Sequence, residues 1–173
     1  YALKKVLISN GLVLEFGVFT GFTLNFLAFK KPNWKIEGFD SFEGLPQFWN
    51  QTNPKGKFSI SGKLPPVLRN VSLNKGLFEE SIPIYLSTLN NTEIKIKYLH
   101  IDCDLYSSTK TIFNLLRDFI ASGTVIVFDE YFNYHGWENG EFKAFQEFVK
   151  ENSINYEYIT YNYLGCQVAL RIK

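Results

Sequence analysis

The sequence predicts an α/β protein built on one doubly wound, mostly parallel sheet. Short apolar runs typical of buried strands alternate with segments of helical periodicity. No internal repeat, low-complexity tract or linker rich in Gly and Ser divides the chain. The 173 residues are 46% hydrophobic, which suffices for one sizeable core. We therefore expect residues 1–173 to form a single domain.

Seven strands are predicted from apolar or alternating segments bounded by residues that favour turns. In chain order they fall at residues 12–15, 34–39, 68–73, 94–101, 124–128, 156–161 and 166–172. The first and fifth are apolar almost throughout, as expected for strands that helices cover on both faces. The last two are joined by only four residues, so we expect them to form an antiparallel hairpin.

Five helices are predicted, one before the first strand and four between strands. They fall at residues 2–9, 22–29, 79–89 and 139–151, with one more between Thr109 and Ser122. Thr20 or Thr23 is expected to cap the helix at 22–29, and Ser107, Ser108 or Thr109 the helix that follows them. Residues 47–66 contain three prolines and two glycines instead, which predicts a long irregular loop of the kind that often closes over a ligand.

Composition and charge exclude several classes of partner. The formal net charge is +1 and the basic residues are scattered, so we expect no nucleic acid partner. No apolar run approaches the ~20 residues of a membrane span, and residues 1–11 lack the features of a signal peptide. We therefore expect a cytoplasmic protein without membrane contact. Cys103 and Cys166 fall in predicted buried strand segments, which favours free thiols.

Residues 12–23 predict a strand, a tight glycine turn and a helix start, which together resemble a nucleotide-cofactor loop. Gly17 and Gly21 let the backbone approach a ligand without a Cβ in the way. Their spacing lacks the Gly-x-Gly-x-x-Gly pattern of dinucleotide sites, and Glu15 suits a cationic or hydroxyl-bearing group better than a pyrophosphate. An ordinary strand-to-helix turn is the alternative.

Acidic residues follow four of the predicted strands. They are Glu15, Asp40, the pair Asp102 and Asp104, and the pair Asp129 and Glu130. Ligands of open α/β sheets bind outside the carboxyl ends of the strands, where all these side chains are expected. Asp40 follows the second strand, about where nucleotide-binding folds place an acid that takes the two ribose hydroxyls. We therefore expect the binding site at this edge of the sheet.

The four acids from Asp102 to Glu130 follow two strands that should be neighbours. Concentrated carboxylates repel one another unless a cation or protons offset them. Oxygen ligands without His or Cys favour Mg²⁺, Mn²⁺ or Ca²⁺, although some of these acids could instead cap helices or pair with lysines. His135 lies just past this cluster and is a candidate general base. His100 lies within a strand and is expected to be a satisfied core residue.

Five segments carry a family resemblance. They are residues 15–21, 38–46 (Gly-Phe-Asp-Ser-Phe-Glu-Gly-Leu-Pro), 75–78, 100–109 (with Ile-Asp-x-Asp-x-Tyr-x-Ser-Thr) and 123–131. In this order they resemble S-adenosylmethionine-dependent methyltransferases, and within these the macrocin O-methyltransferase family. The resemblance covers nearly the whole chain. It implies a Rossmann-like methyltransferase fold, with a mostly parallel seven-stranded sheet, a C-terminal antiparallel hairpin and helices on both faces.

The resemblance also implies contacts for the cofactor S-adenosylmethionine. Its methionine part would lie in a pocket shaped by Glu15, Gly17 and Gly21, with Thr20 or Thr23 nearby. The remaining implied contacts are Asp40 on the ribose, Ser41 and Phe42 beside the adenine, Gly76, Leu77 and Phe78 on its other side, and Asp102 close to the cofactor.

The metal positions implied by the resemblance are Asp102, Asp129 and Glu130, which would hold Mg²⁺. Relatives often have two adjacent aspartates where this chain has Asp129-Glu130, and the longer side chain moves the oxygen by about one methylene. Metal dependence is therefore an open question. Asp102 and His135 are the candidate catalytic residues.

These features predict methylation of a hydroxyl on a sugar or another small hydroxylated metabolite. One alternative is a metal-dependent glycosyltransferase that uses Asp102 and Asp104 to hold Mn²⁺ and a nucleotide sugar. Another is a non-catalytic relative that keeps the fold and the cofactor. The family usually has more chain before its first strand, where lid and oligomer contacts arise. A missing or minimal N-terminal segment is therefore expected, and a homo-oligomer is left open.

Overall fold

The computed structural model describes residues 1–91 and 93–173 and contains a seven-stranded sheet of order β3-β2-β1-β4-β5-β7-β6. The strands are β1 (Leu12–Phe16), β2 (Ile36–Asp40), β3 (Val71–Lys75), β4 (Ile96–Ile101), β5 (Val125–Phe128), β6 (Tyr156–Tyr161) and β7 (Val168–Ile172). The first five run parallel, and β7 pairs antiparallel with both β5 and β6. The predicted fold class, including the hairpin, is confirmed.

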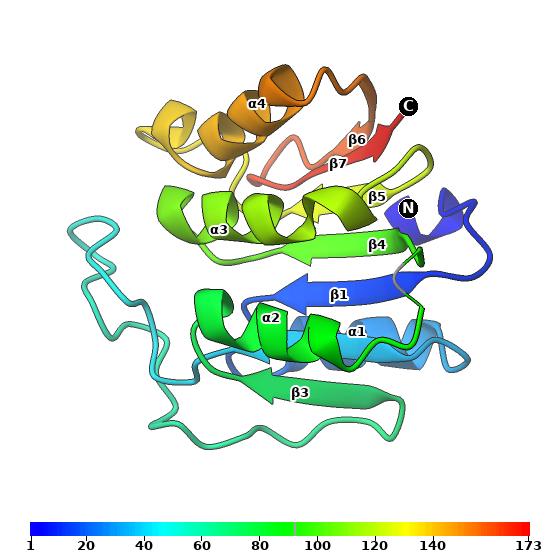
Figure 1. Ribbon diagram of the computed structural model, residues 1–173. Helices are drawn as coiled ribbons and strands as arrows, with labels where there is room; N and C mark the ends of the chain where they lie inside the picture. Colours follow the sequence, from blue (N-terminus) through cyan, green and yellow to red (C-terminus); the bar gives the residue numbers. More distant parts are fainter. Residues whose placement is uncertain (92) are drawn as a thin grey trace.

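Helices cover both faces of this sheet (Figure 1). They are α1 (Phe22–Lys30), α2 (Phe78–Ser87), α3 (Tyr106–Leu116) and α4 (Glu141–Glu151), with 3₁₀ segments at Ala2–Lys4, Arg117–Phe119 and Trp137–Asn139. Side chains of α2, α3 and α4 pack with the sheet in one core, and those of α1 pack with it in a second core. The strand order reverses between β1 and β4, so the switch point of the sheet lies at their carboxyl ends.

Several predicted boundaries and caps are wrong. The helix at residues 2–9 is only the 3₁₀ segment Ala2–Lys4, and the third strand begins at Val71 rather than at residue 68. No threonine side chain caps α1, because Gly21 is its N-cap in a left-handed conformation. Leu105 is the N-cap of α3, with no side-chain cap, so the predicted serine and threonine caps lie within the helix.

The connection between β2 and β3 is irregular, as predicted for residues 47–66, and contains no helix in residues 41–70. Figure 1 shows it projecting beyond the carboxyl ends of the parallel strands. Trp49 in this segment contacts the ring of Tyr134, which follows β5, at 6.0 Å between centroids. Two connections that are distant in sequence therefore meet above the switch point.

Both cysteines are free, as predicted, although Cys103 and Cys166 lie just outside β4 and β7. Among residues 1–91 and 93–173, no helix is long and apolar enough to cross a membrane.

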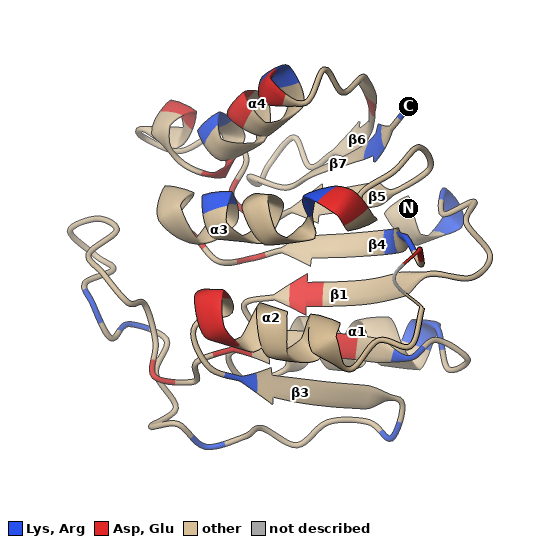
Figure 2. Cartoon of the chain, in the orientation of Figure 1, with Lys and Arg blue, Asp and Glu red and all other residues tan. Residues whose placement is uncertain are grey.

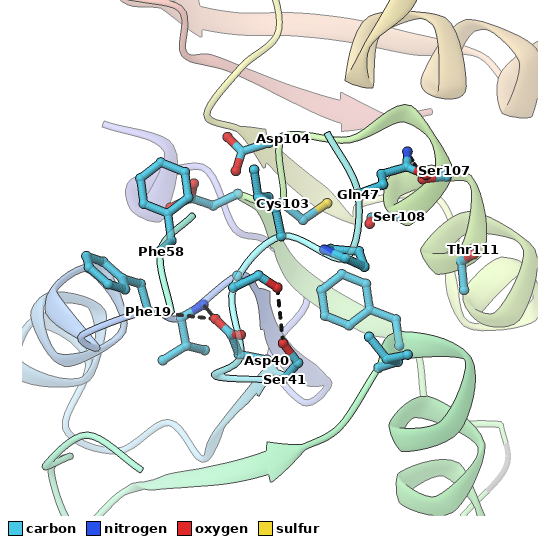
Figure 3. A pocket seen from close by; sticks show the side chains of 18 of the residues that line it. Phe19, Asp40, Ser41, Gln47, Phe58, Cys103, Asp104, Ser107, Ser108 and Thr111 are labelled. Atoms are coloured by element: carbon cyan, nitrogen blue, oxygen red, sulfur yellow. Dashed lines mark hydrogen bonds between the residues drawn. The ribbon is translucent and has the colours of Figure 1, made fainter. Parts of the chain in front are cut away.

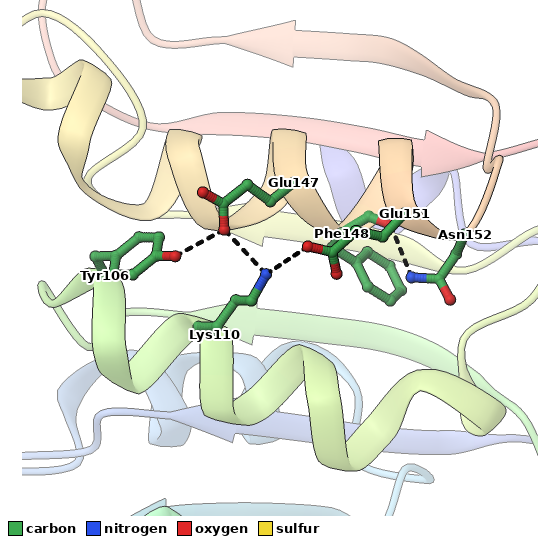
Figure 4. Close-up of polar contacts among 6 residues, drawn as sticks. All are labelled: Tyr106, Lys110, Glu147, Phe148, Glu151 and Asn152. Atoms are coloured by element: carbon green, nitrogen blue, oxygen red, sulfur yellow. Dashed lines mark hydrogen bonds and ion pairs between the residues drawn. The ribbon is translucent and has the colours of Figure 1, made fainter.

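The α3 and α4 helices are joined by aromatic packing beneath and by polar contacts above. Phe113 is fully buried, and its ring stacks on that of Phe148 at 4.6 Å. Nearer the surface, Lys110 donates to Glu147 and Glu151 at 2.9 Å each, and the Tyr106 hydroxyl donates to Glu147 at 2.7 Å (Figure 4).

Replacing Phe113 by alanine should lower the free energy of unfolding by about 3–5 kcal/mol, because it opens a cavity in the core. Lys110→Ala on the same helix should cost less than about 1 kcal/mol, since partly exposed ion pairs contribute little. Urea titration of both variants measures the difference. Equal losses would contradict aromatic packing as the main link between α3 and α4.

Candidate functional site

A cavity of about 490 Å³ opens at the carboxyl ends of β1, β2 and β4. This volume is typical of small-molecule sites, which span roughly 300–1,000 Å³. Its walls come from the turn after β1, the start of the irregular connection, and the first turns of α2 and α3 (Figure 3). The site thus lies at the switch point, where the strand-end acids predicted it.

The turn after β1 packs directly against the end of β4. Gly17 has φ +90°, and a Cβ there would lie 1.6 Å from the carbonyl oxygen of Asp102. The Gly17 amide donates to the Phe39 carbonyl at 3.0 Å, and the Asp102 amide donates to the Phe16 carbonyl at 2.8 Å. Only glycine permits this close approach of the turn to the segment after β4.

Asp40 holds this turn in place. Its Oδ2 accepts hydrogen bonds from the amides of Val18 and Phe19, both at 2.8 Å, and its Oδ1 accepts one from the amide of Phe42 at 2.7 Å. Figure 3 shows Asp40 between the turn and Ser41 at the cavity floor. The carboxylate therefore orients the turn after β1 as well as facing the cavity.

Glu15 is buried behind the turn, at 1% exposure, and does not line the cavity. It accepts a hydrogen bond from the Thr23 hydroxyl at 2.8 Å and pairs with His100 Nδ1 at 3.0 Å. Burial opposes a charge on His100, but the hydrogen bond and charge of Glu15 outweigh it and raise the pKa of His100 to about 9. His100 is thus a satisfied core histidine, as predicted.

Besides Asp40, the cavity is lined by Glu79 on α2 and by three acids that follow β4 and β5: Asp102, Asp104 and Glu130. Burial raises the pKa of Asp102 to about 7, with neighbouring acids adding to the shift and His100 opposing it. Burial and the charges of Asp129 and Asp40 raise the pKa of Asp104 to about 7 as well. Burial and Glu141 raise the pKa of Glu130 well above its ordinary range, and its Oε2 is a buried atom without a hydrogen-bond partner. Within residues 1–91 and 93–173, no hydrogen bond to these carboxylates stabilises their charged form.

Sequence reasoning missed Glu141, which begins α4 and is fully buried. Its two oxygens accept hydrogen bonds from the amides of Cys103 and Glu130, both at 3.3 Å. The side chain therefore ties the segment after β4 to the segment after β5. Its spacing of three, four and seven residues from Ala144, Phe145 and Phe148 on the buried face of α4 is the signal that could have revealed it.

The structure separates the predicted site residues into two groups. Those that line the cavity are Gly17, Asp40, Ser41, Gly76, Leu77, Phe78, Asp102 and Glu130. Those that do not are Glu15, Thr20, Gly21, Thr23, Phe42, Asp129 and His135. His135 is exposed in the loop after β5, and Phe42 is fully buried beneath the turn. Lining residues that sequence reasoning missed include Phe19, Gln47, Phe58, Ser107, Ser108 and Thr111.

Phe19 and Phe58 had no local signal, because their proximity depends on the path of the long connection. Their rings meet edge to face at 5.7 Å, and both residues have positive φ, at 49° and 66°. Ser107 and Ser108 line the cavity, whereas the sequence pattern led us to expect them as helix caps.

The group best placed to hold a cation differs from the predicted set. His100, Asp102 and Asp129 each offer one ligand atom, and these atoms all lie within 4.8 Å of one another. Glu130 is not in this group, although it follows Asp129 directly. Gln167 donates to Asp129 Oδ2 at 3.2 Å, which orients that carboxylate.

Gly17→Ala should destabilise the fold more than Gly56→Ala does. Both glycines have left-handed backbones, at φ +90° and +83°, so each alanine should cost about 1–2 kcal/mol for the conformation alone. A Cβ at Gly56 meets no atom within 4 Å, whereas one at Gly17 clashes with the Asp102 carbonyl. Urea unfolding compares the two variants, and equal losses would refute the close approach of β1 and β4.

Comparison with solved structures identifies methyltransferases. The calicheamicin methyltransferase CalS11 superposes with a TM-score of 0.79 and 25% identity, over 98% of this chain and 75% of that chain. The O-methyltransferase NovP superposes with a TM-score of 0.65 and 20% identity, over 94% of this chain and 72% of that chain. TomG from Streptomyces achromogenes, an O-methyltransferase solved with S-adenosylmethionine, superposes with a TM-score of 0.56 and 15% identity, over 99% of this chain and 77% of that chain.

A search of curated proteins found no match. The model of the macrocin O-methyltransferase (TylF) family matches residues 66–167, which is more than half of the chain. This match includes the strand-end acids Asp102, Asp104, Asp129 and Glu130. The chain therefore belongs to the macrocin O-methyltransferase family and is an S-adenosylmethionine-dependent O-methyltransferase.

Proposed function

We propose that this enzyme methylates a hydroxyl of a sugar or another small hydroxylated metabolite, with cofactor and acceptor side by side in the switch-point cavity. The observation that carries the proposal is the glycine turn after β1, which Asp40 anchors and which opens onto a cavity lined by carboxylates. Methyl transfer from a sulfonium needs an aligned acceptor hydroxyl, exclusion of water and removal of the hydroxyl proton. No covalent enzyme intermediate is required.

The residues present fit S-adenosylmethionine. Gly17 and Val18 of the turn line the cavity, so the methionine part would lie against them, and the surrounding carboxylates favour its sulfonium and ammonium charges. Ser41 and residues 76–78 would hold the adenine between β2 and α2. A carboxylate has about four lone-pair sites, and amides already occupy three on Asp40, so we assign it one ribose hydroxyl.

Several predicted residues that do not line the cavity hold the backbone elements around it in place. Thr23 donates to Glu15, which links the first turn of α1 to β1 and, through His100, to β4. Phe42 is packed under the turn, and Gly21 is the N-cap of α1. We infer that these residues fix the shape of the turn without touching the cofactor.

A Mg²⁺ ion also fits the donor set. Asp102 and Asp129 supply hard oxygen ligands, and these oxygens lie within 4.8 Å of each other. A bound Mg²⁺ lowers the pKa of a coordinated hydroxyl and orients it. His100 is a poor ligand, because Glu15 occupies its Nδ1 and favours the protonated ring.

Proton removal from the acceptor is assigned to the cavity acids rather than to His135. Asp102 lies on the cavity wall, whereas His135 is exposed and does not line it. Asp102 would receive the proton at its carboxylate as the hydroxyl oxygen attacks the methyl group. His135 stays a prediction that requires the loop after β5 to move.

The family assignment removes the glycosyltransferase alternative and favours an enzyme over a non-catalytic relative. A transfer assay with labelled S-adenosylmethionine and a panel of sugars and phenols tests the proposal directly. Methylation restricted to carboxylates or amines would overturn the assignment to hydroxyl acceptors.

Asp40→Ala should weaken binding of S-adenosylhomocysteine by about 1–3 kcal/mol, the scale of a lost hydrogen bond to a charged group. Titration calorimetry measures the affinity. Asp118→Ala is the matched control, because Asp118 is exposed and does not line the cavity. A thermal melt separates loss of the contact from loosening of the turn, and unchanged affinity in a folded Asp40→Ala protein would remove the ribose assignment.

Excess EDTA should abolish methyl transfer, and added Mg²⁺ should restore it. Asp129→Asn should lose more turnover than cofactor affinity, because its carboxylate would act through the metal rather than on the cofactor. Parallel transfer assays and calorimetry separate the two quantities. Full activity in EDTA would show that no metal takes part and would leave proton removal to the protein's own acids.

A further inference from the structure

We propose that the outer face of α1 docks this protein on an anionic lipid bilayer. The surface consists of Phe22, Phe26 and Phe29 on α1 and of Leu64 and Leu68 from the irregular connection, and we call it the α1 face. None of these residues lines the cavity. The inference therefore goes beyond the proposed function and does not depend on the acceptor.

The helix α1 is apolar on its exposed side as well as on its buried side. Its buried residues, which pack toward the sheet, are Leu24, Leu27 and Ala28. Phe22, Phe26 and Phe29 follow the spacing of one helix face and are 79%, 54% and 71% exposed. A helix that is apolar on all sides is typical of one that is covered on all sides. We therefore expect the exposed side of α1 to have a partner.

Residues 64–68 widen this apolar surface. The Asn25 side chain on α1 donates to the Pro66 carbonyl and accepts from the Leu68 amide, both at 2.9 Å, so the segment is held along the helix. Leu64 and Leu68 are both exposed. With the three phenylalanines they expose on the order of 500 Å², if each fully exposed side chain offers about 200 Å². Exposed apolar surfaces of this size mark interaction sites for proteins or membranes.

The charge of this part of the molecule is one-sided. The α1 face comes from residues 16–36 and 44–78, which hold eight of the 18 lysines and arginines and none of the 17 acids. The rest of the chain carries the excess of acid, so the net charge of +1 hides two parts of opposite sign. Figure 2 shows basic positions at the end of α1 and along the irregular connection.

Four of these cations flank the α1 face. Lys30 and Lys31 follow the last phenylalanine, and Lys30 Nζ lies 5.4 Å and 5.6 Å from the centroids of two phenylalanine rings. Lys63 precedes the first leucine, and Arg69 follows the second. Within the described residues, none of the four pairs with an acid. Phenylalanines beside lysines are typical of helices that lie in a membrane interface, where rings enter the acyl region and cations meet anionic headgroups.

Two other occupants fit the α1 face less well. In a two-fold dimer the same surface meets itself, so the flanking cations of both copies would face one another. The exposed apolar area is also smaller than the roughly 800 Å² per partner of a standard interface. Single-stranded nucleic acid would match the charge and stack bases on the phenylalanines, but Leu64 and Leu68 offer no ring and gain most from an apolar medium.

The sequence pattern led us to expect no membrane contact, because no apolar run is long enough to span a bilayer. That argument does not apply to α1, which would lie in the plane of the surface rather than cross it. Docking would also bring the cavity close to the bilayer. The N-cap of α1 is Gly21, and Phe19, two residues earlier, lies on the cavity wall.

Flotation with vesicles of equimolar phosphatidylcholine and phosphatidylserine measures docking, with phosphatidylcholine vesicles as the neutral comparison. Binding should be at least about tenfold tighter to the anionic vesicles and should weaken as salt rises. Phe29→Gln should weaken it several-fold, because the ring no longer enters the acyl region. Lys30→Gln combined with Lys63→Gln should weaken it by about tenfold, because two headgroup contacts are lost.

The matched controls lie outside the α1 face. Ile84→Gln on α2 replaces an apolar side chain that is 68% exposed, and Lys143→Gln with Lys150→Gln removes two exposed cations from α4. Both controls should bind vesicles as the unchanged protein does. A thermal melt checks that each variant folds, and Phe22→Gln replaces Phe29→Gln if the latter does not. Absence of binding to anionic vesicles, or equal losses in the controls, would overturn the proposal.

Quenching by lipids with brominated acyl chains tests which surface enters the bilayer. Phe26→Trp places an indole on the α1 face and Ile84→Trp places one on α2, and the signal of the three native tryptophans is subtracted. Brominated anionic vesicles should quench the indole at position 26 and leave that at position 84 unchanged.

The other occupants predict different results. An unquenched indole at position 26 would overturn docking through α1. A dimer that forms without lipid and that Phe29→Gln dissociates, measured by analytical ultracentrifugation, would assign the α1 face to a second copy instead. Tighter binding to a single-stranded RNA oligonucleotide than to anionic vesicles would assign it to nucleic acid.

Discussion

Carboxylates crowd one edge of this sheet, because parallel strands that each end in an acid bring those acids together. Each of them must find donors or stay costly to ionise in a partly buried place. The protein satisfies some from its own backbone and side chains. Asp40 takes three amides, Glu141 takes two, and Glu15 takes a hydroxyl and an imidazole. These contacts join the turn after β1, the ends of β2, β4 and β5, and the starts of α1 and α4.

The acids that stay unsatisfied then mark the functional surface. Asp102, Asp104 and Glu130 face the cavity, and burial raises the pKa of each. Such groups favour a ligand that brings positive charge or donors, which S-adenosylmethionine and a metal ion both do. Hydrogen bonding therefore separates the two kinds of acid. A carboxylate that accepts hydrogen bonds from the protein stabilises the fold around the cavity, and one without such donors is available to ligands.

The strand-end acids and the sheet were predictable because they depend on local patterns. Apolar runs locate the strands, and parallel topology then gathers whatever follows them. The division between satisfied and unsatisfied acids was not predictable, because its contacts span long separations, such as the 85 residues between Glu15 and His100. The same holds for Phe58, which reaches the cavity only through the path of an irregular connection. The caps of α1 and α3 were mispredicted because Gly21 and Leu105 occupy those positions without side-chain hydrogen bonds.

Asp40 also couples two parts of the site that differ in sequence and in role. Its Oδ2 fixes the turn after β1, and its Oδ1 fixes Phe42, where the irregular connection begins. That connection carries Gln47, which reaches Ser107 on α3, and Trp49, which reaches Tyr134 after β5. A ligand hydroxyl bound to Asp40 would therefore act on the anchor of both the turn after β1 and the start of the irregular connection.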